Sequence, residues 1–491
     1  MAARLRQEGL LLAAGALVAL LWPWTAYAVS PFALPALFAA GAVSIATLRR
    51  PEVGIALALA VAPVAGIAVG GTRPLLFALF ALALGLFAYG LLRRHSAAAR
   101  LPAVALAALV FLGLAIASAL QALEPGQALA DITWLAVAVA LMLATLQICQ
   151  TRRQVLVVAA GAVAGLAVAA LHGLVQRATG QHSDISFVAA GEVVQRVSGA
   201  FGHPNQYAGM LAVLIPLGLA LATARHLPAR LRAGAAVAVL LALPALAFAY
   251  TRGAIIGLFV GGLLWLGFLR PRVAVVAVLV AAVVGGLFAP PALRDRFETE
   301  SGGDVTLRAD IWGSALDIYA EHPLLGAGVG NFAEAYRALP VTPVSSSQRR
   351  LLHTGQVLVP PHAQNLYLNL LAEQGTLGLL GFALLALLAL ATAVRGARAR
   401  DPLTRTIALG LGGGLLTLAV HNVLEVTVFG ERLEVTVLVL TAAVAVLLRL
   451  ERDGSSAVAP EPGANTPPWG AMTVRAPLLD TWPAEPHPRP G

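Results

Sequence analysis

Long apolar runs separated by short polar segments occupy the chain from one end to the other. About fourteen runs are long enough to cross a bilayer, although those centred near Ala40, Ala62 and Leu241 are short or interrupted by proline. Continuous apolar runs predict helices, whereas outer-membrane barrels show shorter alternating segments. The pattern therefore predicts an all-α polytopic membrane protein with about 12–14 transmembrane helices.

The runs and the segments between them divide the chain into six parts. These are N-terminal transmembrane helices (1–173), a first long loop (174–203), core transmembrane helices (204–290), a second long loop (291–362), C-terminal transmembrane helices (363–450) and a tail (451–491). The tail is rich in Pro, Ala and Gly and has few large apolar residues, so we expect it to be disordered.

Arginine placement gives the orientation, because the chain contains no lysine and all 33 basic residues are arginine. With the N-terminus inside, every short inside loop is basic, as the positive-inside rule requires. Both termini are then expected in the cytoplasm, and both long loops on the outer side. Ala26-Tyr-Ala28 is similar to a signal cleavage site, but the next run must return inward, so we expect an uncleaved anchor.

Composition limits the kinds of site that the chain can form. A single cysteine, Cys149, excludes an internal disulfide and a thiolate metal cluster. The net charge of +9 comes from arginines dispersed between the runs, which favours a topological role over nucleic-acid binding. The sequence has no Asp-x-Asp pair and no His-Glu-x-x-His motif, so we expect neither a metal nor another cofactor.

Polar residues open the apolar run that continues to Val394. Counted at 100° per residue from His362, Asn369 and Glu373 fall within about 20° of it and Asn365 at about 60°. Read as the start of a membrane-spanning helix, this stripe indicates a site near the membrane surface. The alternative is hydrogen bonding between packed helices.

Two arginines lie on the outer side in positions that need a reason. Arg252 sits in a tight connection between two runs, and Arg196 precedes Pro204, which suits the first position of a helix. A helix N-terminus beside a guanidinium binds phosphate well, so we expect a phosphate or diphosphate site. The alternative is that these side chains only reach toward lipid headgroups.

The second long loop contains an amphipathic helix. Apolar residues recur at helical spacing from Arg308 to Glu321, and Pro323 ends the helix. We expect this helix to cover the bundle as a lid or to lie along the membrane interface. The glycines from Gly326 to Asn331 predict a tight turn that brings the loop back to the bundle.

Four motifs, in order, resemble those of the O-antigen ligase and O-antigen polymerase superfamily, which includes bacterial O-linked oligosaccharyltransferases. They are Arg196-Val-Ser-Gly-Ala-Phe-Gly-His-Pro-Asn205-Gln, Thr251-Arg-Gly-Ala254, Arg308 with Trp312 and His322-Pro-Leu-Leu-Gly326-Ala-Gly-Val-Gly-Asn-Phe332, and His362-Ala-Gln-Asn365-Leu-Tyr-Leu. The resemblance extends from about Arg196 to Val394. In this chain Gln364 occupies the position before Asn365 where many relatives have histidine.

The resemblance implies a metal-independent, inverting glycosyltransferase of the GT-C type in the bacterial inner membrane, with its active site facing the periplasm. Such enzymes take a glycan from an undecaprenyl-diphosphate carrier. A ligase passes the glycan to the lipid A-core, and a polymerase passes it to a second lipid-linked glycan. The alternative outside the enzyme class is a polysaccharide or lipid transporter, although polar sites of transporters often lie at mid-membrane between repeats.

The resemblance also implies roles for individual residues. His362 would be the catalytic base that activates the acceptor hydroxyl, while Arg252 and Arg196 would hold the diphosphate. The expected substrate-binding residues, of which Asn365 and Glu373 would also orient His362 or support its helix, are Asn205, Arg308, Asn365, Asn369 and Glu373.

Overall fold

The computed structural model describes residues 47, 49–67, 73–92, 101–181, 183, 185–189, 192–269, 272, 302–339, 359–427 and 433–456. The chain forms two compact units, Met1–Glu451 and Arg452–Gly491. All helices and strands named below lie in the first unit, except for the last residues of the final helix.

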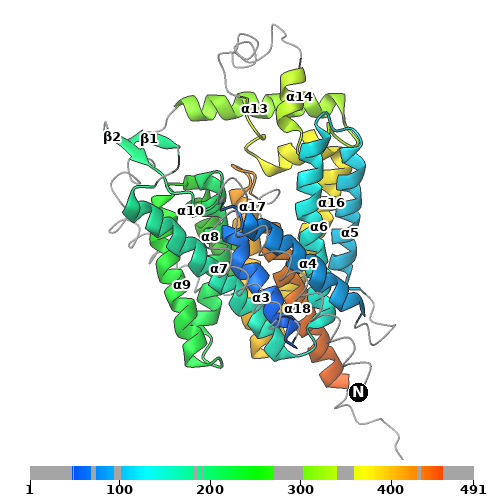
Figure 1. Ribbon diagram of the computed structural model, residues 1–491, viewed down its shortest axis with the longest axis vertical. Helices are drawn as coiled ribbons and strands as arrows, with labels where there is room; N and C mark the ends of the chain where they lie inside the picture. Colours follow the sequence, from blue (N-terminus) through cyan, green and yellow to red (C-terminus); the bar gives the residue numbers. More distant parts are fainter. Residues whose placement is uncertain are drawn as a thin grey trace, which may run out of the picture. The chain divides into compact units, whose positions relative to one another are not determined.

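The first unit is a bundle of helices with one short hairpin (Figure 1). In chain order the elements of the described residues are α3 (Pro51–Val61), η1 (Ala62–Val64), α4 (Pro74–Leu92), α5 (Ala103–Ala119), α6 (Pro125–Ile148), α7 (Arg152–Thr179), β1 (Ser186–Ala189), β2 (Glu192–Gln195), α8 (Pro204–Thr223), α9 (Ala229–Phe248), α10 (Arg252–Leu269), α13 (Gly302–Glu321), α14 (Phe332–Ala338), α16 (Leu366–Ala397), α17 (Pro402–His421) and α18 (Leu433–Ser456).

Apolar helices of membrane-spanning length confirm the predicted fold class. Within the described residues, eight helices are long and apolar enough to cross a bilayer, and three shorter apolar helices accompany them. The irregular run near Leu241 is a spanning helix, α9, whereas the run near Ala62 is interrupted when α3 gives way to a single 3-10 turn ending at Val64. Helix α7 continues to Thr179 and α18 to Ser456.

Several sequence-based predictions fall outside the described residues. These are the apolar runs near Val18, Ala40 and Ala281, the segment Ala26-Tyr-Ala28, and the tail beyond residue 456. The total number of membrane crossings and the position of the N-terminus therefore stay predictions.

Local sequence explains where the helices begin. Thr151 caps α7 through a reciprocal pair of hydrogen bonds with Gln154, and Asp401 caps α17 through the Thr404 amide. As predicted, Pro204 occupies the first position of α8. These caps satisfy amide groups that have no partner inside the helix.

Small residues let the helices pack at backbone distance, which is how membrane helices associate without a hydrophobic driving force between them. On α7, an added Cβ at Gly161 would lie 2.4 Å from the Ala56 carbonyl oxygen of α3. On α10, an added Cβ at Gly261 would lie 2.4 Å from the Thr417 amide nitrogen of α17. Both contacts leave no room for a larger side chain.

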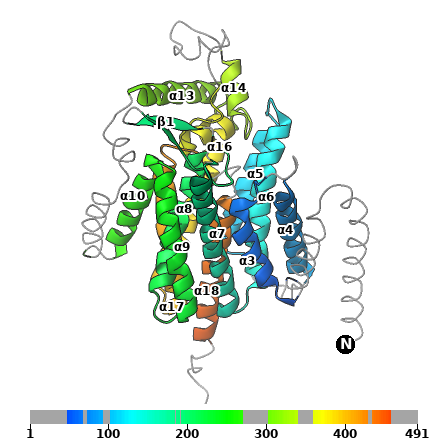
Figure 2. The ribbon, with the colours of Figure 1, turned by 60° about the vertical axis from the view of Figure 1, so that its left-hand side comes forward.

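One end of the bundle carries the irregular segments. The β1–β2 hairpin, with Ser186 paired to Gln195, lies at this end beside the start of α8, and α13 crosses it (Figures 1 and 2). Helix α13 confirms the amphipathic helix predicted from the sequence, and it ends at Glu321, just before Pro323. Ile311, Ala315 and Ile318 bury its apolar face.

Helix α16 is broken at Gly375, whose backbone has φ 65° and ψ −165°. This conformation is essentially restricted to glycine. The part of the helix after the break is by itself about 33 Å long, which suffices to cross a hydrocarbon core of about 30 Å. The part before the break, which begins at Leu366, is therefore not needed to cross the membrane. It belongs to the end of the bundle that carries the irregular segments.

The loop after α13 fills the break in α16. Its carbonyls at Pro323 and Leu324 accept hydrogen bonds from the amides of Thr376 and Leu377, at 2.9 and 3.2 Å. Non-helical backbone in a membrane protein requires such protein partners.

The same loop also satisfies the helix segment on the other side of the break. The amides of Ala327 and Gly328 donate to the carbonyls of Ala372 and Glu373, each at 2.9 Å. This contact confirms the tight turn predicted from the glycines between Gly326 and Asn331.

Substitution at the break should destabilise the protein. Gly375→Ala places Cβ 2.4 Å from the Leu324 backbone, at a position whose positive φ is strained for alanine. We therefore expect the free energy of unfolding to fall by at least about 2 kcal/mol. Gly113→Ala in α5 is the matched control, because nothing lies within 4 Å of its added Cβ. The measurement is the thermal unfolding midpoint in detergent, and equal midpoints for both variants would contradict the packing described.

Candidate functional site

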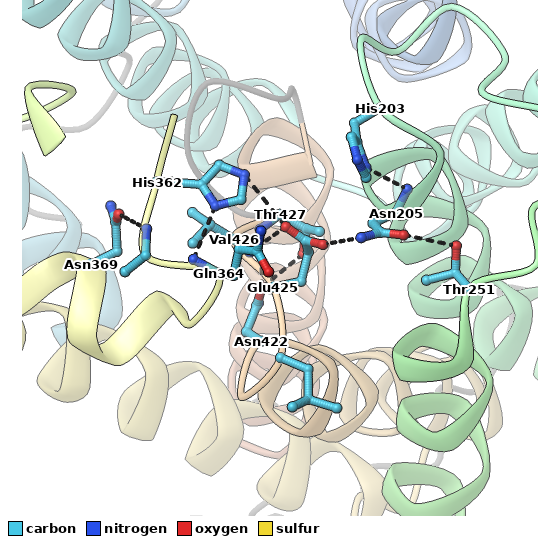
Figure 3. Close-up of polar contacts among 12 residues, drawn as sticks. His203, Asn205, Thr251, His362, Gln364, Asn369, Asn422, Glu425, Val426 and Thr427 are labelled. Carbon is cyan, nitrogen blue, oxygen red and sulfur yellow. Dashed lines mark hydrogen bonds and ion pairs between the residues drawn. The ribbon is translucent and has the colours of Figure 1, made fainter. Parts of the chain in front are cut away.

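Four segments that are distant in sequence meet at the end of the bundle that α13 crosses. They are the start of α8, the connection between α9 and α10, the loop before α16, and the loop after α17 (Figure 3). Their polar side chains form one connected set of contacts, which we call the Glu425 network. Its members are Arg196, His203, Asn205, Thr251, His362 and Glu425.

His362 faces a carboxylate. Its Nε2 lies 3.4 Å from Oε1 of Glu425, and its Nδ1 accepts a hydrogen bond of 3.1 Å from the Gln364 amide. This pattern assigns the proton of the neutral imidazole to Nε2, on the Glu425 side. Gln364 itself has φ 52°, a left-handed conformation that is uncommon for a residue other than glycine.

Glu425 is buried at 3% exposure and must be compensated by its surroundings. One carboxylate oxygen accepts a hydrogen bond from the side-chain amide of Asn205, and the other accepts from the Val426 backbone amide at 3.2 Å. Burial alone would raise its pKa, but the imidazoles of His362, His421 and His203 and the Asn205 hydrogen bond hold it below its ordinary value.

The opposite balance applies to His362. Burial lowers the pKa of the imidazole below its ordinary value of 6.5, and the positive charge of Arg308 lowers it further, while Glu425 partly opposes both. At neutral pH the pair therefore consists of a neutral imidazole and an ionised carboxylate. This is the protonation state that a general base needs before it accepts a proton.

Asn205 links the carboxylate to Arg196. Its side-chain oxygen accepts from Nη2 of Arg196 at 2.7 Å, and the same Nη2 donates to Thr251 Oγ1 at 2.9 Å. Arg196 Nε donates to the Ala249 carbonyl at 2.8 Å, and the residue is 4% exposed. These contacts bring Arg196, Asn205 and His362 together, with Glu425 between the arginine side and the imidazole.

His203 lies on the far side of Glu425 from His362 (Figure 3). It is the N-cap residue of α8, where its Nδ1 accepts from the Asn205 amide at 3.1 Å. Burial lowers the pKa of its imidazole, and the Glu425 charge partly offsets that effect. A capping role therefore accounts for this histidine.

Two further arginines border the network. Arg252 is the first residue of α10, directly after Thr251, and is partly buried. Arg308 reaches across from α13, and its Nη1 donates to the Leu424 carbonyl at 2.6 Å. Both guanidinium groups thus belong to segments that adjoin Glu425 or its partners.

The structure corrects the interpretation of the His362 stripe. Helix α16 begins at Leu366, not at His362, and Asn365 is its N-cap, accepting from the amides of Tyr367 and Leu368. Asn365 also donates to the Val423 carbonyl at 3.0 Å. His362 therefore lies in a loop, and its angular position on a helix has no meaning.

The two stripe residues that do lie on α16 support the surrounding loops. Asn369 accepts from the Ala363 amide at 3.0 Å, next to His362. Glu373 accepts from the Phe332 amide at 3.1 Å, at the start of α14. Neither contact involves the His362 side chain, so these residues fix the loops that flank the network.

Sequence reasoning missed Glu425. The candidate site residues named from the sequence include the carboxylate of Glu373 but not that of Glu425, which lies at the centre of the network, in the connection between α17 and α18. A signal was present, since Glu425 is an acidic residue in a short connection between two apolar runs. It carries no motif, however, and only the fold brings it to His362. Among the described residues, no group of three or more His, Cys, Asp or Glu side chains is placed to hold a metal ion.

Part of the chain matches a known protein family. Residues 236–383 match the sequence profile of the O-antigen ligase family, a segment that begins within α9 and ends within α16. It includes Arg252, Arg308 and His362, whereas Arg196, Asn205 and Glu425 lie outside it. No curated protein matches the chain. The match over residues 236–383 supports the resemblance of this chain to the superfamily of O-antigen ligases and polymerases.

Proposed function

We propose that this chain is a metal-independent, inverting glycosyltransferase that moves a glycan from an undecaprenyl-diphosphate carrier to an acceptor hydroxyl. The reaction takes place at the periplasmic face of the bacterial inner membrane, and both chain termini are cytoplasmic. The approach of His362 Nε2 to Glu425 Oε1, at 3.4 Å, carries the proposal. It supplies a neutral imidazole and a buried carboxylate at the end of the bundle to which the long loops contribute.

The pair acts as an oriented base. Glu425 keeps the proton of the neutral ring on Nε2, which leaves the lone pair of Nδ1 for catalysis. The acceptor hydroxyl replaces the Gln364 amide at Nδ1 and gives up its proton there, while its oxygen attacks the anomeric carbon. The bond from that carbon to the diphosphate oxygen breaks, and Glu425 stabilises the imidazolium that forms.

The leaving diphosphate gains negative charge as that bond breaks, so cationic groups bind the transition state more tightly than the ground state. We assign this task to Arg252, which stands at the N-terminal end of α10 where the helix dipole adds to its charge. Arg308 borders the same region. The protein contacts of Arg196 favour a role in positioning Asn205 and Thr251 beneath the leaving group.

The acceptor separates the two candidate activities. A ligase uses the lipid A-core, and its loss leaves polymer on the carrier lipid. A polymerase uses a second lipid-linked glycan, and its loss reduces a ladder of chain lengths to one repeat. Both products can be followed in the same deletion strain, so one gel of lipid-linked and core-linked glycan distinguishes the activities.

Removing the proposed base should abolish transfer. We expect His362→Ala to reduce the rate at least about 100-fold, as is typical for loss of a general base. His226→Ala is the control, since His226 is exposed in the connection between α8 and α9. Transfer is measured in membranes with each variant at equal abundance. Wild-type activity in His362→Ala would remove the assigned role.

The pH profile should report the His362–Glu425 pair. Because the pKa of His362 lies below 6.5, kcat/KM is expected to fall only on the acid side of that value. In Glu425→Gln the imidazole loses the charge that raises its pKa. The acid limb should therefore move to lower pH, and the plateau should drop about 10- to 100-fold. An acid limb that stays in place or moves upward would contradict the pairing.

Arg252 should be required for the chemical step. Loss of one preorganised electrostatic group typically costs about 100-fold or more in kcat, so we expect that loss for Arg252→Ala and a smaller one for Arg252→Lys. The control is Arg230→Ala, an exposed arginine in the first turn of α9, on the opposite end of the bundle. Single-turnover rates would decide the matter, and equal rates in both Ala variants would rule out the assignment.

A further inference from the structure

Trp312, on α13, belongs neither to the apolar core nor to the Glu425 network. Helix α13 crosses the end of the bundle that carries the site (Figures 1 and 2). Trp312 follows Arg308 by one helical turn, and residues four apart lie on the same side of a helix. Because the Arg308 guanidinium reaches the Leu424 carbonyl next to Glu425, this side of α13 faces the site.

The ring of Trp312 is not part of the apolar contact between α13 and its neighbours. That contact is made by Ile311, Ala315 and Ile318, which are each 1% exposed. Trp312 lies in neither of the two apolar clusters found in the described residues, and it is partly exposed. A large aromatic residue is thus left at the border of the site without an apolar partner cluster.

The indole N–H of Trp312 makes the position unusual. Its Nε1 is buried, and no hydrogen-bond acceptor is found for it among the described residues. Indole nitrogen is only a donor, and a buried tryptophan N–H normally finds a partner. A membrane-interface tryptophan would leave this nitrogen in the wet headgroup layer. The buried nitrogen therefore indicates an acceptor that arrives with a ligand.

We propose that Trp312 forms one wall of the subsite for the transferred sugar, with its ring against the apolar face of a pyranose and its Nε1–H donated to a sugar hydroxyl. This inference rests on the proposed function, since it places the donor glycan between α13 and the Glu425 network. Ligand sites commonly combine an apolar aromatic wall with a few polar groups that fix orientation. Trp312 supplies both from one side chain.

The experiment compares Trp312→Phe and Trp312→Ala with wild type, using purified protein and undecaprenyl-diphosphate-linked glycan extracted from cells that lack this chain. Trp312→Phe keeps a ring and removes the N–H, so KM for the glycan should rise about five-fold, with kcat changed by less than about two-fold. Trp312→Ala should raise KM further. Leu316→Ala is the control, because Leu316 is 49% exposed one turn along α13.

A second measurement separates the sugar from the lipid carrier. Undecaprenyl diphosphate without a glycan should inhibit wild type and Trp312→Phe equally, because Trp312 contacts the sugar alone. An unchanged KM in Trp312→Phe, or an equal loss of diphosphate inhibition, would overturn the sugar subsite. If His362→Ala kept full transfer, the proposed function itself would fail. If His362→Ala were inactive while Trp312→Phe behaved as wild type, only the sugar subsite would fail.

Discussion

A buried carboxylate that must remain ionised is the constraint around which the site is organised. Glu425 is almost completely shielded from bulk water. Without compensating partners, burial would raise the pKa of its carboxyl group until the group became neutral. Its compensation comes from α8 through Asn205 and from the loop before α16 through His362. Each partner must in turn be held in place, which explains why Arg196 and Thr251 are buried behind Asn205.

The second constraint is that the polar backbone groups at a break in a helix must find hydrogen-bond partners. A helix cannot be interrupted in a membrane protein unless other protein groups satisfy the freed amides and carbonyls. Here a single turn after α13 does so on both sides of Gly375. One consequence is mechanical, because the loop that directly follows the Arg308 helix is joined to α16 by backbone hydrogen bonds. Motion of this loop relative to α16 would have to break them.

The sequence allowed the class of fold, the start of α8 at Pro204, the end of α13 before Pro323 and the glycine turn to be predicted, since each depends on local periodicity or on proline and glycine. It also identified His362, Arg196 and Asn205 as candidate site residues. The start of α16 was misjudged because an apolar run does not mark its own first residue, although Asn365 is a common N-cap residue. Glu425 could not be assigned, because its partners Asn205 and His362 come from two other segments.

The O-antigen ligase profile covers residues 236–383 and ends within α16. The contacts that hold the turn after α13 reach beyond these residues. Ser118 on α5 donates to the Glu373 carbonyl at 2.8 Å, and Asn331 accepts from the Glu124 amide between α5 and α6. The tip of an early hairpin of helices thus braces a segment more than 200 positions later. A chimera that exchanged only residues 236–383 between two such proteins would separate interlocking surfaces. The natural grafting unit includes the α5–α6 tip and the connection from α17 to α18.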